Sequence, residues 1–376
     1  MRIAIVTESF VPTVNGVTNS VLRLLEHSAV VGHEVLVVAP GKGANCFADF
    51  SILRVPSVTV PRYRSFRLGI PTPKLRRALT NFGPDVLYVA APFGLGARAL
   101  QLGTRLQVPT VACFQTDVPG FLEQYGLKFV GGALWKWLKY VHNLACRTLA
   151  PSQASVTDLC ANGVNDVFLW RRGVDGNLFH PSRRDDGLRS AWNLNGRLAV
   201  GYVGRLAHEK RVDDLRVLAA DERIKLVIVG DGPQRAFLQR ELPDAEFAGF
   251  RSGEDLARHF ASFDVFVHLG LNETFCQTIQ EAMASGVPVV APARGGPIDL
   301  VSPLRNGLLF EPYDLEHFRR CVSLVVGEPL LRKQLGSHAR KSVEERSWRM
   351  ICGQWDQHLA EVLAEHQRLL APVECP

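Results

Sequence analysis

The chain has 376 residues, 47% of them hydrophobic and 21% charged, which suits a globular protein large enough for two domains with their own cores. No apolar run approaches the ~18 residues of a membrane span, and the run behind Met1 is too short for a signal peptide, so we expect a cytoplasmic protein. The eight cysteines include no Cys-x-x-Cys pair, which indicates reduced thiols and disfavours a zinc site. The net charge of +6 is concentrated in residues 1–177, where 18 Lys and Arg face 10 Asp and Glu, and it indicates an anionic partner for this half.

Strands alternate with helices through the first half. Short apolar runs predict buried strands at 2–7, 34–39, 51–55, 85–90 and 109–114. Alternation of this kind is typical of a parallel doubly wound sheet, whose ligands bind beyond the carboxyl ends of the strands. Asn15 and Gly16 begin the helix after the first strand, where they allow a positive φ and a close approach to a ligand; the alternative is a simple turn.

Gln115 and Asp117 follow the strand at 109–114. Because Gln115 is a neutral amide, it cannot act as a general base, but it can hydrogen-bond a ligand hydroxyl through its carbonyl or its amide. Asp117 is the nearest ionisable side chain, and it fits a cap for the following turn equally well.

Two segments, 61–77 and 126–147, carry ten basic residues and no acidic one. The second also carries tryptophans, and a basic stretch with Trp and Leu is how an interfacial helix would look. At about 1 kcal/mol per basic residue near an anionic surface, such segments give reversible membrane binding. The alternative is a solvated basic face whose tryptophans belong to the core. No recognised nucleic-acid module is present, so we expect no nucleic-acid partner. The residues that the membrane interpretation selects are Arg62, Arg64, Arg67, Trp135, Lys136, Trp137 and Lys139.

The second half repeats the pattern after a segment, 171–181, that connects the halves and a polar linker at 182–187. The strand predicted at 198–203 is followed by Arg205 and Lys210. Arginine offers a bidentate fork to phosphate and lysine a point charge, so two cations at a strand tip favour a phosphate-binding site; the alternative is a pair of ordinary surface charges.

Two glutamates flank the start of another helix. A strand predicted at 263–268 precedes Glu273, and Glu281 lies about two turns into a helix predicted at 276–285. A helix that starts beyond a strand end points free N–H groups and its positive dipole end at a ligand, while carboxylates accept hydrogen bonds from sugar hydroxyls. The arrangement therefore suits a nucleotide-sugar.

Glu273-x7-Glu281, followed by Ala-Met-Ala-Ser-Gly-Val-Pro, resembles the retaining glycosyltransferases of the GT-B fold in the large family called glycosyltransferase family 4. The resemblance extends over essentially the whole chain. It implies two doubly wound, Rossmann-like parallel-sheet domains that face a cleft, and a C-terminal helix that crosses back to the first domain. The implied ranges are 1–177 for the acceptor- and membrane-facing domain, 188–346 for the nucleotide-sugar domain and 347–370 for the crossing helix.

Glu-Thr-Phe-Cys-Gln-Thr at 273–278 and Phe-Gln-Thr-Asp at 114–117 resemble the versions in actinobacterial GDP-mannose-dependent α-mannosyltransferases that modify lipid-linked glycans. Cys276 stands where glycine is common, and Gln115 where histidine is usual. The resemblance implies transfer of mannose from GDP-mannose to a lipid-linked glycan or glycolipid, such as a glucuronosyl diacylglycerol or a phosphatidylinositol mannoside. It implies no cofactor or metal, an anionic lipid or glycolipid partner, and a place at the inner face of the plasma membrane.

The same resemblance implies roles for individual residues. Arg205 and Lys210 would hold the diphosphate, Glu273 the mannose hydroxyls, Glu281 the ribose hydroxyls, and Gly16 would allow close approach of a phosphate. The remaining implied donor contacts are Gln115, Phe250, Arg251, Phe275, Cys276 and Gln277. Those on the acceptor side are Asn15 and Asp117.

Other classes fit less well. The chain contains no Asp-x-Asp, Gly-x-Gly-x-x-Gly or P-loop motif, which disfavours a metal-dependent GT-A transferase, an oxidoreductase and an NTPase. A UDP-sugar-dependent family 4 transferase, a nucleotide-sugar epimerase of the same fold and a non-catalytic glycan- or lipid-binding protein remain as alternatives.

Overall fold

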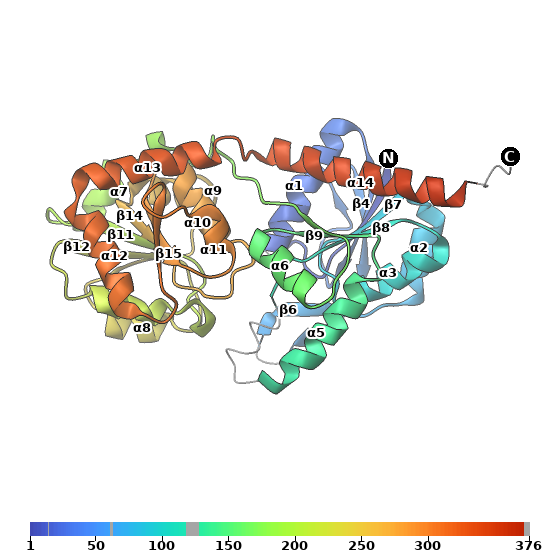
Figure 1. Cartoon of the computed structure of the whole chain (residues 1–376), viewed down its shortest axis with the longest axis horizontal. Coiled ribbons are helices and arrows are strands. Elements are labelled where there is room, and N and C mark those ends of the chain that lie inside the picture. The colour runs from blue at the N-terminus through green and yellow to red at the C-terminus, as the bar shows by residue number, and fades with distance from the viewer. Residues whose placement is uncertain (14, 61–62, 118–127, 372–376) are drawn as a thin grey trace. The chain divides into compact units, whose positions relative to one another are not determined.

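A computed structural model gives the structure of the chain (Figure 1). It describes residues 1–13, 15–60, 63–117 and 128–371. Contacts divide the chain into two compact units: the first unit contains Met1–Arg171 and Arg349–Pro376, and the second contains Arg172–Trp348. The first break lies six residues before the expected one at 177, because the segment from Arg172 onward packs with the second unit.

The first unit is built on a sheet whose described strands have the order β10-β9-β8-β7-β1-β2-β4-β3. Neighbouring strands are parallel except β3 and β4, an antiparallel pair that the sequence did not predict. The strand order reverses between β1 and β7, which is where a doubly wound sheet opens a crevice for ligands. The strands are β1 (Arg2–Val6), β2 (Glu34–Pro40), β3 (Cys46–Phe47), β4 (Phe50–Val55), β7 (Val86–Val89), β8 (Thr110–Cys113), β9 (Arg147–Ala150) and β10 (Val167–Leu169).

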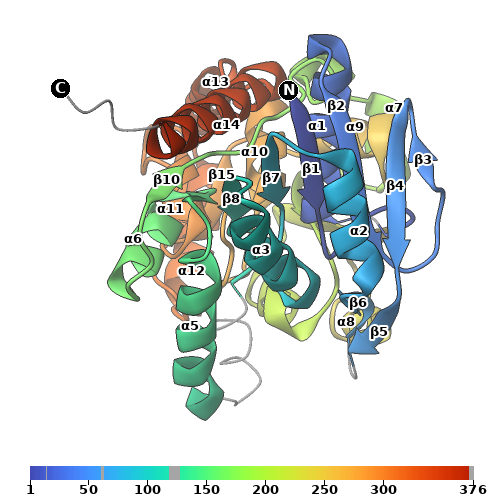
Figure 2. The same cartoon turned by 90° about the vertical axis from the view of Figure 1, so that its right-hand side faces the viewer.

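Helices pack on both faces of this sheet because its strands are apolar on both sides. Figure 2 shows α2 and α3 in front of the strands, where Leu79 and Leu100 join a core with Val6. On the other face, the ring of Tyr88 lies 5.4 Å from that of Trp355 in α14. The helices are α1 (Gly16–Val31), α2 (Pro73–Phe82), α3 (Gly94–Leu106), α5 (Lys128–His142), α6 (Gln153–Ala161) and α14 (Trp348–Leu370).

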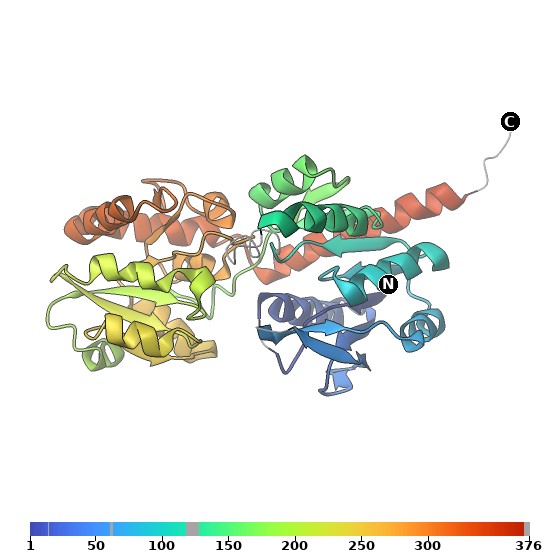
Figure 3. The same ribbon diagram turned by 90° about the horizontal axis from the view of Figure 1, so that it is seen from below.

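The last helix, α14, is long and continuous (Figure 3) and is fastened to the first unit by charged contacts. Asp356 accepts hydrogen bonds from His27 at 2.6 Å and His33 at 3.1 Å. Arg147, only 4% exposed, pairs with two glutamates of the same helix, Glu361 and Glu365. Arg147 therefore belongs to the core of the unit and not, as its place in the basic segment suggested, to a membrane-facing surface.

β5 (Ser57–Val60) and β6 (Tyr63–Gly69) pair as an antiparallel hairpin, where the sequence predicted no strands, and β6 lies within the first basic segment. The buried carboxylate of Glu8 accepts hydrogen bonds from the N–H groups of Gly69, Leu95 and Gly96, which ties the hairpin to the end of β1 and to the start of α3. Burial raises the pKa of Glu8 despite these bonds. Of the basic residues selected here, Arg62 and the side chains of Arg64 and Arg67 lie outside the described residues.

The second unit contains a fully parallel sheet with the order β13-β12-β11-β14-β15-β16. One face packs on α9, α10 and α13, and the other on η3, α8 and α12. Two consecutive helices, α12 and α13, follow β16, because Glu328 ends the first and Pro329 begins the second. The elements are β11 (Leu198–Val203), β12 (Ile224–Val229), β13 (Glu246–Gly249), β14 (Val265–Val267), β15 (Val289–Pro292), β16 (Gly307–Phe310), η1 (Pro181–Arg183), α7 (Asp186–Ala191), η2 (His208–Lys210), η3 (Val212–Leu218), α8 (Arg235–Glu241), α9 (Gly253–Ser262), α10 (Gln277–Ala284), α11 (Gly296–Leu300), α12 (Leu315–Gly327) and α13 (Pro329–Val343).

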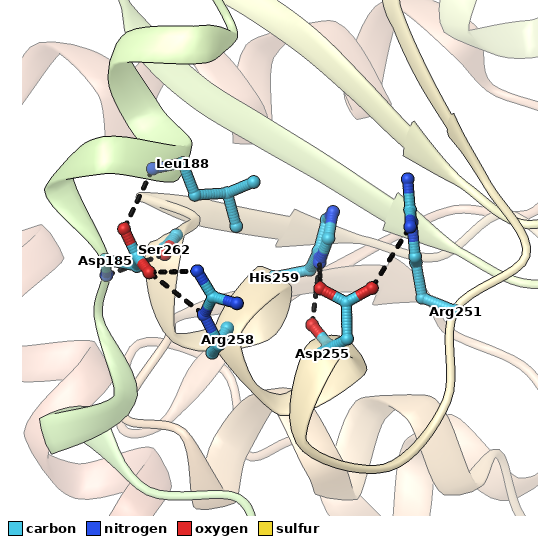
Figure 4. Close-up of polar contacts among 7 residues, drawn as sticks. All are labelled: Asp185, Leu188, Arg251, Asp255, Arg258, His259 and Ser262. Carbon is cyan, nitrogen blue, oxygen red and sulfur yellow. Dashed lines mark hydrogen bonds and ion pairs between the residues drawn. The ribbon is translucent and has the colours of Figure 1, made fainter.

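The interpretation of residues 182–187 as a linker is wrong. Asp185 caps α7 by accepting from the N–H of Leu188 at 2.8 Å and pairs with Arg258 of α9 (Figure 4). Its own N–H donates to Ser262 at 3.0 Å. Both bonding partners of the Asp185 side chain hold the pKa of that carboxyl below its ordinary value. These charged residues look like a solvated linker in the sequence, but their partners lie more than seventy residues away.

Candidate functional site

The charged residues predicted from two strand tips meet at one point of the second unit. β11 lies between β12 and β14, so the strand order reverses between β11 and β14. Parallel strands present their carboxyl ends at the same edge, where ligands of such sheets bind. Lys210 follows β11, Glu273 follows β14, and their side chains form an ion pair. The sequence placed these residues at strand ends; the sheet order brings them together.

Glu273 lies between two basic side chains. Its Oε1 accepts from the ammonium of Lys210 and lies 3.4 Å from Nε2 of His268. His268 is 3% exposed and stands at the end of the same strand as Glu273, in a position to which sequence reasoning gave no role. The sequence shows that His268 stands at a predicted strand end. It does not show the contact with Glu273, because that contact depends on the turn between the two residues.

The charges in this cluster shift one another's pKa values. Burial alone would raise the pKa of Glu273, but the cations of Lys210 and His268 outweigh it and lower that pKa strongly. Burial would lower the pKa of Lys210 and of His268; the thiol of Cys276 and the Glu273 carboxylate act in the opposite direction and raise both. Glu273 is therefore a carboxylate throughout the physiological range of pH.

The cluster also contains metal-ligand atom types. Atoms of His268, Glu273 and Cys276 lie within 4.8 Å of one another, which is the one group of this kind that the described ranges contain. However, the Lys210 ammonium bonds the same carboxylate, and a divalent cation placed there would meet a like charge at close range. The arrangement fits an anionic ligand better than a metal ion.

Glu281 differs from Glu273 although both are glutamates of the same strand–helix unit. It lies about one turn into α10, not two as predicted, because only four residues separate it from the first helical residue, Gln277. No ion pair or side-chain hydrogen bond involves Glu281 among the described residues, and burial raises the pKa of its carboxyl to about 8. A protonated carboxyl at neutral pH is thus ready to ionise when a ligand supplies hydrogen-bond donors.

The loop between Glu273 and α10 uses its side chains for structure. Phe275 belongs to the core, and Gln277 donates to the carbonyl of Gly173 at 2.9 Å, so we expect only their backbone N–H groups to reach a donor. Cys276 has φ 77°, in the left-handed region, and its side chain does not cap α10. That backbone conformation explains why glycine suits the position.

Glycines allow neighbouring loops to pack closely against the loop that contains Arg205 and the loop that contains Glu273. The sequence did not predict this packing. A Cβ on Gly232 would lie 2.4 Å from the carbonyl oxygen of Leu206, beside Arg205. A Cβ on Gly295 would lie 2.6 Å from the carbonyl oxygen of Glu273, which also accepts from the N–H of Gly296. Backbone-to-backbone packing of this kind fixes the positions of both loops. The glycines that follow two strands, Gly230 and Gly232 after β12 and Gly295 and Gly296 after β15, were the signal in the sequence for this close packing.

Three other donor contacts implied by the resemblance, Arg205, Phe250 and Arg251, are more exposed. Arg205 faces Glu209, with 3.9 Å between NH1 and Oε1, and 43% of its side chain is exposed. Phe250 and Arg251 follow β13 at the same edge of the sheet; Phe250 is 69% exposed, and Arg251 pairs with Asp255 at 3.2 Å (Figure 4). All three are accessible to a ligand.

The candidates in the first unit lie at the carboxyl ends of its strands. Asn15 caps α1 by accepting from the N–H of Thr18 at 2.9 Å, and neither it nor Gly16 uses the positive φ that the sequence allowed. A Cβ on Gly16 would meet nothing within 4 Å. Gln115 donates to the carbonyl of Ala90 at 2.7 Å and is 9% exposed, while Asp117 is half-buried. The side chains of Asn15 and Gln115 thus have structural bonds.

Helix α5 carries the other membrane candidates. Lys136, Trp137 and Lys139 are exposed, and the ring of Trp137 lies 5.9 Å from that of Tyr140. Trp135 packs instead against the core of this unit, so only one of the two tryptophans is a surface residue. In the part of the chain that the structure describes, none of the helices combines the length and apolarity of a membrane span.

Comparison with known proteins agrees with this architecture. The family model Glycosyltransferase Family 4 matches residues 14–177, and the model Glycosyl transferases group 1 matches residues 187–342. A sucrose-phosphate synthase from Thermosynechococcus elongatus has the same fold, with a TM-score of 0.78, 20% identity and coverage of 97% of this chain and all of the other. The fold and the charged strand tips define a GT-B glycosyltransferase, as predicted.

Two relatives are much more similar in sequence. A GDP-mannose-dependent alpha-mannosyltransferase of Mycolicibacterium smegmatis is 49% identical over 96% of this chain and 98% of its own length. One from Corynebacterium glutamicum is 45% identical over 98% and 91%, respectively. The chain belongs to the family of GDP-mannose-dependent alpha-mannosyltransferases, which confirms the resemblance seen in its motifs.

Proposed function

We propose that the protein transfers mannose from GDP-mannose to a lipid-linked glycan or glycolipid, with retention of the anomeric configuration. The observation that carries the proposal is the contact between Lys210 and Glu273 at the strand-order reversal of the second sheet. The GDP-mannose dependence of the two relatives supports the donor. No metal or cofactor enters the proposal.

Each charged residue would bind a different part of the donor. A diphosphate would draw the Lys210 ammonium away from Glu273 and meet Arg205 and the first N–H groups of α10. Glu273 would then accept from mannose hydroxyls, and Glu281 from the ribose hydroxyls. The ion pair between Lys210 and Glu273 holds both side chains in place until the donor arrives.

The chemical step follows from these positions. The bond between the anomeric carbon and the phosphate oxygen breaks while an acceptor hydroxyl forms a new bond to that carbon on the same face. The departing phosphate takes the proton of the hydroxyl, so the neutral amide of Gln115 need not act as a base. Lys210 and Arg205 stabilise the negative charge that develops on the phosphate.

A panel of nucleotide-sugars tests the donor. Thermal shift should single out GDP-mannose, since each tenfold excess of ligand over its dissociation constant adds about 1.4 kcal/mol of stability. Selective stabilisation by UDP-sugars would contradict the mannose assignment. Incubation with donor alone separates an epimerase, which would release an isomerised sugar. A non-catalytic protein would bind donor and release no GDP in the presence of membrane lipid.

The exposed basic and aromatic face of α5 supports an acceptor held at a membrane surface. Trp137 and Tyr140 offer amphipathic rings, and Lys136 and Lys139 attract anionic headgroups. We expect the protein to sediment with vesicles that contain anionic lipid and not with neutral ones. A Lys136→Glu/Lys139→Glu variant should lose this binding, whereas Lys333→Glu on α13 should keep it. Equal sedimentation of all variants would refute the surface.

A further inference from the structure

The start of α10 is bonded to the segment by which the chain enters the second unit. The amide of Gln277 donates to the carbonyl of Gly173 at 2.9 Å, and the amide of Gln280 donates to that of Arg172 at 3.0 Å. The chain passes between the units immediately before Arg172. The helix that faces the donor therefore holds the entering segment by two side chains on its first turn.

The returning segment lies against the entering one. The N–H of Val174 donates to the carbonyl of Arg346 at 2.8 Å, and Val174 forms a parallel bridge with Ser347. The approach is so close that a Cβ on Gly173 would lie 2.6 Å from the Cα of Trp348. Since the chain leaves the unit after Trp348, both crossing points are attached to α10.

Stability alone does not account for Gln280. Its side chain is fully buried, and its Oε1 has no hydrogen-bond partner among the described residues. A buried amide oxygen without a partner is costly, and a methionine of similar length would fill the space without that cost. The distinctive contribution of the glutamine is the bond from its amide to Arg172.

We propose that Gln277 and Gln280 are positioning residues that couple occupancy of the donor site at the start of α10 to the two crossing segments, 172–174 and 346–348. The coupling rests on the proposed function, because the ligand that acts on α10 is the donor diphosphate. A displacement of the first helical turn on phosphate binding moves both amides, and through them the two points from which the chain continues into the first unit.

Hydrogen exchange with GDP as the probe tests the coupling on the full chain. In the wild type, saturating GDP should slow exchange of the Val174 amide, which bridges the crossing segments. In a Gln277→Met/Gln280→Met variant, the dissociation constant for GDP should stay within about threefold while this protection disappears. At saturating GDP-mannose, kcat should fall by up to about 10²-fold, the cost of a misplacement of about 1 Å that originates far from the chemistry, with little change in KM for the donor.

A matched control separates coupling from simple destabilisation. Asn306 is a buried amide of the same unit that donates to the carbonyl of Leu300 and to the hydroxyl of Ser342 on α13. Among the described residues, no hydrogen bond joins its side chain to 172–174 or 346–348. Asn306→Ala should lower the melting temperature and leave both the GDP-dependent protection and kcat intact. If the double variant does not fold, Gln277→Met alone carries the test, since that side chain is partly exposed.

The outcomes distinguish this inference from the proposed function. Failure of the wild type to bind GDP would refute the donor assignment. Binding of GDP without a response of the crossing amides, or an unchanged response and kcat in the glutamine variants, would refute the coupling and leave the transferase proposal standing.

Discussion

Glu273 and Glu281 stand eight residues apart at the same end of the second sheet, yet at neutral pH the first is a carboxylate and the second is a neutral carboxyl. Two neighbouring cations keep Glu273 ionised. Burial without a charged partner raises the pKa of Glu281 to about 8. Identical side chains on one strand–helix unit thus acquire different chemistry from their surroundings, a common arrangement where an enzyme handles charge.

Removing Lys210, the cation paired with Glu273, should have the largest effect on turnover. We expect Lys210→Ala to lower kcat/KM for GDP-mannose by about 10²- to 10³-fold, because it takes away charge that stabilises the leaving diphosphate. Arg211→Ala is the matched control: this cation is the next residue but pairs with Asp214, and its loss should leave steady-state kinetics nearly unchanged. Near wild-type turnover in Lys210→Ala would count against the assigned role.

Neutralising Glu273 should reveal the coupling among the paired charges. Glu273→Gln removes the carboxylate that helps to raise the pKa of His268, so NMR titration should show that pKa shifted downward. His142, buried in the first unit with its pKa lowered to about 4, provides an internal reference that should not move. We expect turnover to fall on the order of 10²-fold. An unchanged titration of His268 would show that Glu273 does not act on it.

Glu281, the glutamate without a charged partner, should make donor binding depend on pH. Ribose hydroxyls donate to the ionised carboxyl, so binding favours the deprotonated form of Glu281. Below a pKa of about 8 that form is the minor one in the free protein, and the dissociation constant for GDP should improve about tenfold from pH 7 to pH 9. Calorimetry on Glu281→Gln should show weaker, flat binding. Wild-type affinity that is constant or falls with rising pH would contradict this.

Cys276, in the loop between the two glutamates, should tolerate substitution by glycine. Cys276→Gly removes the cost of a left-handed β-carbon, about 1 kcal/mol, and adds a similar loss of chain entropy, so stability should change little. Kinetics should stay within about threefold of the wild type. Cys276→Val is the contrasting variant: a β-branched residue at this φ should destabilise by about 1–3 kcal/mol in chemical denaturation. Equal stability of both variants would show that the backbone is not strained there.

Local patterns predicted most of the scaffold because they depend on near neighbours. The predicted strands at 34–39 and 198–203 agree with β2 and β11 to within a residue, since buried parallel strands are continuous apolar runs. The same reasoning missed the hairpin of β5 and β6, because the basic residues of β6 look like a solvated segment. It also called 182–187 a linker, because the partners of Asp185 lie far away along the chain.

The sequence alone determined the alternation of strands and helices, the family, and the charged residues at the strand tips of the second half. Only the tertiary structure decided that Lys210 meets Glu273, that His268 completes their cluster, and that Gln277 turns its amide to Gly173 instead of outward. The reason is physical: side-chain type and helix or strand periodicity are local, whereas the order of strands in a sheet sets which distant residues share an edge. The ionisation of each group then follows from those neighbours.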